Sequence, residues 1–234
     1  MTYYEHCVTG LSATGRDEHV DASEHPHTAL SDAALRYAQD RQWDIALGTW
    51  LIWNGRGVSC SCGQPDCAAP GVHPAERNWQ EQATSNPARV RHWWSRHPQA
   101  SIVAPTGRSF DVIDVPEQAG FLALARLERN GALLGPVMAT APRRLLFFVL
   151  PGSGEKFPDL LRQTGWGGFP LDLIYRGAGD YILAPPSRLP SGVVQWVRPP
   201  TEANQLLSDV SDLINPIAYA CGRHILPSPR RAVG

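Results

Sequence analysis

The stretch FDVIDV, residues 110–115, predicts a β-strand that carries two acidic residues. Its β-branched and aromatic side chains suit a strand, and successive side chains along a strand point to opposite faces of the sheet. Asp111 and Asp114 are three positions apart in the sequence. We therefore expect their carboxylates on opposite faces, so that only one of them can face a given site.

Helices and strands alternate on both sides of this stretch. Further strands are predicted at 43–53, 101–104, 145–150 (LLFFVL), 171–175, 181–184 and 193–197, and helices at about 31–38, 87–96, 118–130, 157–164 and 202–221. Asn86 is the expected cap of the helix over 87–96, with Pro87 in its first turn. The mixture, with its hairpin-like connections, favours an α+β fold around a mixed or largely antiparallel sheet over a doubly wound parallel one.

Composition limits the classes of function. The chain has 234 residues, 43% of them hydrophobic, which is enough for a real core. Its formal net charge of −1 excludes a globally basic nucleic-acid binder but leaves room for a local basic patch. No apolar run is long enough to span a membrane, and the first residues have no signal-peptide pattern, so we expect a cytoplasmic protein without membrane contact.

The boundaries of the folded part follow from changes in composition. Residues 1–27 are polar and lack an apolar period, which predicts a flexible N-terminal tail. One domain is expected over 28–222, followed by a C-terminal tail over 223–234. Because the chain ends soon after its last predicted helix, we expect any helicase or other replication protein that works with it to be a separate protein.

Three cysteines and one histidine lie close together in a loop expected at about 54–78. Cys60, Cys62, Cys67 and His73 form the pattern C-x-C-x4-C-x5-H. Three thiolates and one imidazole satisfy tetrahedral zinc and leave no open position, so the ion would be structural. A loop with so little apolar material needs another source of order, which zinc binding supplies.

Two other interpretations of this loop stay open. The spacing C-x-C is less usual in zinc sites than C-x2-C, so the cysteines could be incidental reduced thiols in a loop. His73 could be an ordinary loop residue, with Cys7 or a water molecule as the fourth ligand.

Four stretches, in their order and spacing, resemble a known family. They are 67–79 (CAAPGVHP, then NW), 86–107 (NP, WW, HP and SIVAPTG), 111–124 (DVIDV, then GFLAL) and 171–196 (LDL, RG, YILAPPS, SG and W). Together they are similar to the bifunctional DNA primase/polymerase N-terminal domain of the archaeo-eukaryotic primase superfamily. The resemblance implies an RRM-like sheet joined to a second α/β lobe, with nucleoside triphosphates and a DNA template bound in the cleft between them.

The resemblance also implies two-metal catalysis by Mg²⁺ or Mn²⁺, which needs carboxylates that share a pair of ions. The first acid of the family's metal-binding strand corresponds to Asp114, but the second, two positions later, corresponds to Pro116. Glu117 lies just beyond the strand and could swing back as a substitute. The acid of a later strand corresponds to Asp172, which could also be an ordinary residue at the end of a strand.

A second departure concerns the histidine that contacts nucleotide phosphates in the family. Its position corresponds to Leu145. Arg143 and Arg144 precede it and could hold phosphate through bidentate hydrogen bonds, or they could lie in a solvated turn. Arg176 and Asp180 could line the same cleft or pair with each other on the surface.

Three functions are therefore considered. The first is a DNA primase/polymerase-like protein that binds nucleotide or DNA and has weak or lost nucleotidyl transfer. The second is an active metal-dependent DNA primase/polymerase that uses Asp114 and Asp172. The third is a zinc-stabilised protein-interaction module with no nucleic-acid role.

The tryptophans and a basic helix add a weaker indication of DNA binding. The chain has eight tryptophans, and exposed aromatic faces can stack on single-stranded bases, although most such side chains pack in a core. The predicted helix over 87–96 and the residue after it carry five basic side chains: Arg89, Arg91, His92, Arg96 and His97. This face could follow a DNA backbone or could simply be solvated.

Overall fold

The computed structural model describes residues 26–55 and 57–225. The first helix, α1 (Pro26–Asp40), begins before the predicted domain boundary at residue 28. The last helix, α6 (Val210–Ile225), continues past the predicted boundary at residue 222. The remaining parts of the two predicted tails, 1–25 and 226–234, lie outside the described residues.

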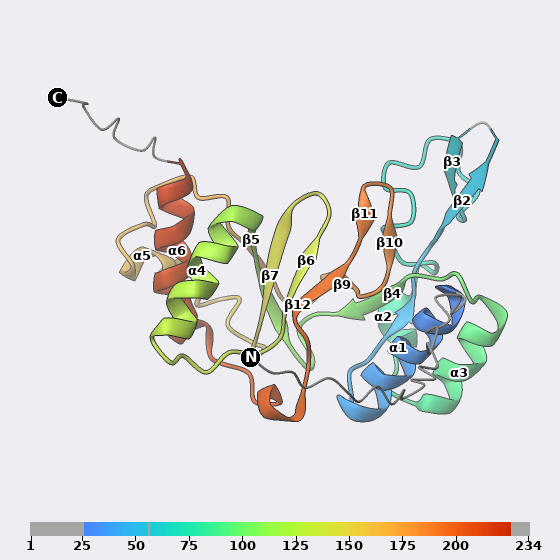
Figure 1. Ribbon diagram of the computed structural model, residues 1–234, viewed down its shortest axis with the longest axis horizontal. Helices are drawn as coiled ribbons and strands as arrows, with labels where there is room; N and C mark the ends of the chain where they lie inside the picture. The colour runs from blue at the N-terminus through green and yellow to red at the C-terminus, as the bar shows by residue number, and fades with distance from the viewer. Residues whose placement is uncertain (1–25, 56, 226–234) are drawn as a thin grey trace, which may run out of the picture.

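A five-stranded antiparallel sheet forms the middle of the molecule (Figure 1). Its strands run in the order β12 (Gln195–Arg198), β6 (Val137–Thr140), β7 (Arg144–Val149), β5 (Asp111–Pro116) and β8 (Ile174–Arg176). The expected strand over 110–115 is thus confirmed as β5, which lies between β7 and β8. In this register Asp114 is opposite Leu146 and Pro116 is opposite Arg144.

One face of this sheet is covered by helices α4 (Glu117–Arg129), α5 (Phe157–Gln163) and α6. Ile113, Leu145 and Phe147 point to this side and pack with α4 and α6 in a first buried core. The two long helices of this layer contact each other along their length (Figure 1). In the part of the chain that the structure describes, no helix combines the length and the apolar character that a membrane span requires.

The other face packs against a layer made mostly of the N-terminal part of the chain, with β9 (Tyr181–Ala184) added to it. There a three-stranded antiparallel sheet of β1 (Ala46–Leu47), β4 (Ile102–Pro105) and β9 lies with α1, α2 (Trp79–Gln82) and α3 (Pro87–Arg96). Aromatic rings join the two sheets in a second buried core: Trp43 lies 4.8 Å from Phe110 and 5.4 Å from Phe148, measured between ring centroids.

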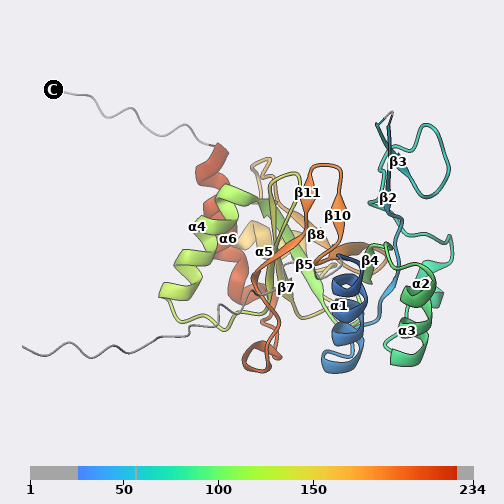
Figure 2. The ribbon, with the colours of Figure 1, turned by 45° about the vertical axis from the view of Figure 1, so that its right-hand side comes forward.

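Two hairpins project from this framework. The first pairs β2 (Leu51–Asn54) with β3 (Gly57–Cys60), and the second pairs β10 (Arg188–Leu189) with β11 (Gly192–Val193). Figures 1 and 2 show the β2–β3 hairpin standing away from the rest of the protein. The loop with the cysteine–histidine cluster starts at the end of this hairpin, because Cys60 is the last residue of β3.

Several predictions of secondary structure were wrong. The helix predicted over 202–221 is interrupted: residues Glu202–Asn204 form the short 3-10 helix η1, and α6 begins only at Val210. Between them Ser208 forms a parallel bridge with Val149 and accepts the backbone N–H of Leu150, so this segment extends along the sheet instead of coiling.

The strand predicted over 43–53 is also divided, into β1 and β2, and the expected loop over 54–78 contains β3. Gly57, the first residue of β3, has a φ of +140°, which glycine adopts without the strain of a Cβ, and it pairs with Asn54 of β2. Strands β6 and β10 were not predicted. Asp172 precedes β8 instead of lying within it.

The predicted cap of helix α3 is confirmed and gives a test of local stability. The Oδ1 atom of Asn86 accepts the backbone N–H groups of Ala88 and Arg89 at 2.9 and 3.3 Å. Replacing Asn86 by Ala is expected to lower the free energy of unfolding by about 1 kcal/mol, because these donors lose their acceptor. Urea denaturation measures the change. Asn78→Ala is the control, since Asn78 makes no side-chain cap bond to α2 and its loss should have a smaller effect.

Candidate active-site cleft and metal centre

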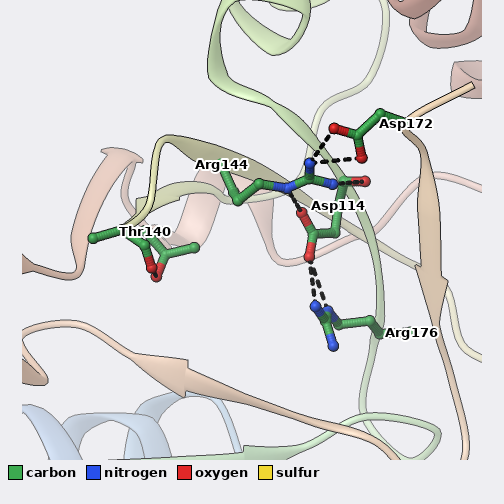
Figure 3. A network of polar contacts seen from close by, with 6 residues as sticks. Asp114, Thr140, Arg144, Asp172 and Arg176 are labelled. Carbon is green, nitrogen blue, oxygen red and sulfur yellow. Dashed lines mark hydrogen bonds and ion pairs between the residues drawn. The ribbon is translucent and has the colours of Figure 1, made fainter. Parts of the chain in front are cut away.

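Asp114 is the buried centre of a charged network on the cleft side of β5 (Figure 3). Only 3% of its surface is exposed. Its Oδ1 atom accepts Arg144 Nε at 2.7 Å, and its Oδ2 atom accepts Arg176 Nε and Nη2 at 3.0 and 2.8 Å. Two guanidinium groups thus satisfy this one carboxylate.

Arg144 connects the two predicted catalytic acids. Besides its bond to Asp114, it donates through Nη1 to both carboxylate oxygens of Asp172 at 2.7 Å, and through Nη2 to the backbone oxygen of Asp114 at 3.2 Å. Burial lowers the pKa of Arg144, but the hydrogen bonds and charges of Asp172 and Asp114 raise it further, so the net shift is upward. The guanidinium therefore stays charged between the two carboxylates.

The segment that carries Asp172 and Arg176 alternates as a strand does. Leu171, Leu173 and Tyr175 pack against the core beside helices α4 and α6. The residues between them include Asp172 and Arg176, which bind the network on the other side. Side chains along this segment thus alternate between the two faces, although only its second half is β8.

Glu117 and Arg143 do not join this network. Glu117 is the first residue of α4, and its Oε2 atom accepts Arg143 Nε at 3.0 Å. The Arg143 side chain is 77% exposed, so the pair lies at the surface. Arg143 also adopts a left-handed φ of +43° in the turn before β7. Glu117, the expected substitute acid, therefore pairs with Arg143 instead of joining Asp114 and Asp172.

The side chain of Leu145 is fully buried on the helix side of β7. It packs against Gly120 of α4, where an added Cβ would lie 2.5 Å from the Cβ of Leu145. Arg144 and Leu146, on either side of it, line the cleft. The position equated with the family histidine thus faces away from the cleft, and Arg144 is the polar cleft residue of this strand.

A cleft of about 270 Å³ lies between the five-stranded sheet and β9. Asp114, Arg144, Arg176, Asp180 and Thr140 supply its polar groups. Its apolar lining consists of Val72, Met138, Ala141, Pro142, Leu146, Ile182, Leu183 and Leu189, together with the ring of Tyr181. The sequence left open whether Arg176 and Asp180 line the cleft or pair with each other, and in the structure both line it. The sequence gave no sign of Thr140, because β6 was not predicted.

The donor set does not fit a pair of divalent ions. Such a pair needs carboxylate oxygens shared between two ions about 3.5–4 Å apart. Here the carboxylates of Asp114 and Asp172 are both bonded to Arg144, and the two acids with Arg144 and Arg176 have a net formal charge of zero. Pro116, at the second position of the expected acid pair, has no side-chain ligand atom.

Asp111 has a separate, structural role on the opposite face of β5. Its carboxylate accepts the backbone N–H groups of Gly107 and Gly152 at 2.6 and 2.8 Å and the hydroxyl of Tyr175 at 2.5 Å. Burial and the neighbouring Asp111 charge raise the pKa of Tyr175, so its hydroxyl remains a donor. The predicted separation of Asp111 from Asp114 is confirmed, and Asp111 joins two loops to the sheet.

The four predicted metal ligands lie together. The ligand atoms of Cys60, Cys62, Cys67 and His73 are all within 4.8 Å of one another. His73 Nε2 is 3.4 Å from the sulfurs of both Cys60 and Cys67. Neighbouring ligand atoms in a tetrahedral zinc site with ordinary bond lengths are about 3.5 Å apart, so the spacing fits such an ion.

The groups around the cluster favour the binding of a cation. His73 Nδ1 lies 2.9 Å from the backbone oxygen of Pro74, which fixes the ring and leaves Nε2 for a metal. Burial raises the pKa of the Cys60 thiol, but hydrogen bonds from the backbone of Cys62 and Gly71 and from side chains outweigh it and lower the pKa to about 6. The Cys3His cluster could therefore bind a metal such as zinc. Cys7, the alternative fourth ligand, lies outside the described residues.

These features define a class of protein: an α+β fold with a charged cleft between antiparallel sheets and a Cys3His cluster on a projecting loop. Residues 34–206 match the family described as bifunctional DNA primase/polymerase, N-terminal (Prim-Pol). The chain belongs to this family, as its motifs predicted. No curated protein and no solved structure matches it.

Proposed function

We propose that this DNA primase/polymerase-like protein binds nucleotide or DNA in the cleft and has weak or lost nucleotidyl transfer. The observation that carries the proposal is the position of Arg144, which bridges Asp114 and Asp172. The proposal includes zinc as the ion of the Cys3His cluster. It also interprets the five-stranded layer as an RRM-like sheet and the N-terminal part as the second α/β lobe.

The argument against efficient transfer is electrostatic. Mg²⁺ or Mn²⁺ would have to displace the Arg144 guanidinium from two carboxylates and would find no third acid at Pro116. Binding a dication beside two arginines also costs Coulomb energy that a cluster of acids would not impose. Because each 1.36 kcal/mol lost at the transition state slows a reaction tenfold, a deficit of a few kcal/mol removes most of the activity.

The argument for retained binding is the chemistry of the cleft lining. An apolar floor suits a nucleobase, and a guanidinium suits a phosphate. Arg176 uses Nε and Nη2 for Asp114, and no hydrogen bond of its Nη1 occurs among the described residues. About a third of this side chain is exposed, so Nη1 can donate to a phosphate while the bond to Asp114 remains.

Primer extension tests the loss of transfer. The full chain is expected to extend a primed DNA template with Mg²⁺ or Mn²⁺ at most weakly, because its acids are neutralised by arginine. Incorporation of labelled deoxynucleotides measures the rate, and Asp114→Ala shows whether any extension comes from this site. Brisk extension that Asp114→Ala abolishes would contradict the proposal and establish an active polymerase that uses Asp114 and Asp172.

Binding of a fluorescent nucleoside triphosphate tests the retained cleft. Arg176→Gln is expected to weaken binding about 10- to 150-fold, since one charge-assisted hydrogen bond contributes about 1.5–3 kcal/mol. Arg162→Gln is the control, because Arg162 is exposed, pairs with Asp159 in α5 and does not line the cleft. If the chain binds neither triphosphate nor DNA, the result favours the interaction module that needs no nucleic acid.

A further inference from the structure

The β2–β3 hairpin exposes apolar side chains to solvent. Trp53 is 70% exposed, and Ile52 and Val58 are also exposed. Trp53 is paired with Val58 across the hairpin, which stands away from the rest of the protein (Figure 2). An exposed tryptophan in a fixed backbone is a ready surface for stacking, but it contributes nothing to the core.

A groove of about 420 Å³ lies beside the hairpin. Its lining consists of Leu30, Trp50, Leu51, Ile52, Trp53, Gln99, Ser101 and Arg188. The ring of Trp50 is 5.7 Å from that of His97, the residue at the end of helix α3. Two tryptophans therefore line the groove, and one of them contacts the residue at the end of the basic helix.

One arginine lines this groove, and a second arginine lies next to His97, which contacts Trp50 of the groove. Arg188 is the one charged residue among the described side chains that line it. Arg96 lies in the last turn of α3, next to His97, and is exposed. Within residues 26–55 and 57–225, neither Arg96 nor Arg188 takes part in an ion pair. Both guanidinium groups are available to an anionic ligand.

The Cys3His loop supports the wall of the groove. Gly71 of this loop, with a φ of +72°, packs so closely on Leu51 that an added Cβ would lie 2.9 Å from its Cδ2 atom. The hydroxyl of Ser101, a groove residue, donates to the backbone oxygen of Gly71 at 3.3 Å. The N–H of Gly71 in turn donates to the sulfur of Cys60. The cluster thus fixes the hairpin relative to the groove floor.

We propose that this hairpin and groove form a binding site for single-stranded DNA, separate from the cleft. Unpaired bases stack on the exposed face of Trp53, and the phosphates contact Arg188 and Arg96. Single strands fit this surface because their bases are free to stack and a cationic groove follows the backbone. The proposal rests on the proposed function as a DNA-binding protein, but its site shares no lining residue with the cleft.

Fluorescence anisotropy with a labelled oligo(dT) tests the site in the full chain. Trp53→Ala is expected to weaken binding about 5- to 150-fold, the loss of one base–aromatic stack. Arg188→Gln is expected to weaken binding and to reduce the dependence of log affinity on log salt concentration by about 0.7, the loss of one phosphate contact on a single strand. Leu206→Ala is the control, since Leu206 is 74% exposed and lies outside the groove.

Triphosphate binding measured on the same variants separates this proposal from the previous one. We expect Trp53→Ala to leave triphosphate binding unchanged, because Trp53 does not line the cleft. Unchanged oligonucleotide affinity in Trp53→Ala would overturn the hairpin site, whatever happens at the cleft. Self-association of the chain that Trp53→Ala abolishes, without an effect on oligonucleotide affinity, would identify a second copy as the occupant and would also overturn it.

Discussion

Protein purified without added zinc is expected to contain about one zinc ion per chain, and Cys60→Ser is expected to lose the ion together with the order of the β2–β3 hairpin. Structural zinc contributes roughly 10–16 kcal/mol of binding free energy in small zinc-binding peptides, and that energy becomes folding energy. In the hairpin and the Cys3His loop, the buried side chains are few, chiefly Leu51 and Cys60. Atomic emission measures the zinc, and hydrogen exchange over 51–75 measures the order.

Cys221→Ala is the matched control for this experiment. Cys221 is also buried, but it lies on α6 in the core beside the five-stranded sheet. Its replacement should leave zinc content and exchange in the hairpin unchanged. If the purified protein contains little zinc and its melting is the same in a strong chelator, the cysteines are incidental and the hairpin has another source of order.

Asp114→Asn is expected to lower the free energy of unfolding by about 3–5 kcal/mol. Removing one partner of a buried ion pair leaves uncompensated charge, and here the amide would face two guanidinium groups. If Asp114 served mainly to bind metal ions, Asp114→Asn would instead raise the free energy of unfolding, because replacing a catalytic group commonly stabilises a protein. The sign of the change, measured by urea denaturation, therefore distinguishes an arginine-bound structural acid from a metal-binding one.

Two further variants test whether the loss of stability comes from the buried charge network. Glu117→Gln removes a carboxylate from the exposed pair with Arg143, so it should cost less than about 1 kcal/mol. Replacing Asp114 by Leu and both Arg144 and Arg176 by Met should recover much of the stability that Asp114→Asn loses, because no buried charge is then left alone. A neutral or stabilising Asp114→Asn would show that the network does not hold the sheet together.

Much of the fold was predictable where a local pattern decides it. The opposite directions of Asp111 and Asp114 follow from strand alternation alone, and the start of α3 follows from Asn86 and Pro87. The Cys3His cluster was predictable because its four residues lie within one short loop. In each case the pattern that decides the feature lies within one short stretch of the sequence.

The remaining features depend on pairing between distant segments. Arg144 was expected as a phosphate ligand, and its position between Asp114 and Asp172 results from the register of β5, β7 and β8. The residues before α6 have helical composition, but the bridge from Ser208 to Val149 draws them out along the sheet. The register between strands and the bridge between Ser208 and Val149 cannot be predicted from the sequence of one segment alone.

The path of the backbone restricts how the cleft can open. The chain leaves the three-stranded sheet after β4, returns to it at β9 and leaves it again before β12. The first two crossings are tied together, since the N–H of Thr106 donates to the oxygen of Asp180 and its hydroxyl donates to that of Gly177 at 2.5 Å. A ligand that moves the two sheets apart must therefore displace both connections together, because these hydrogen bonds join them.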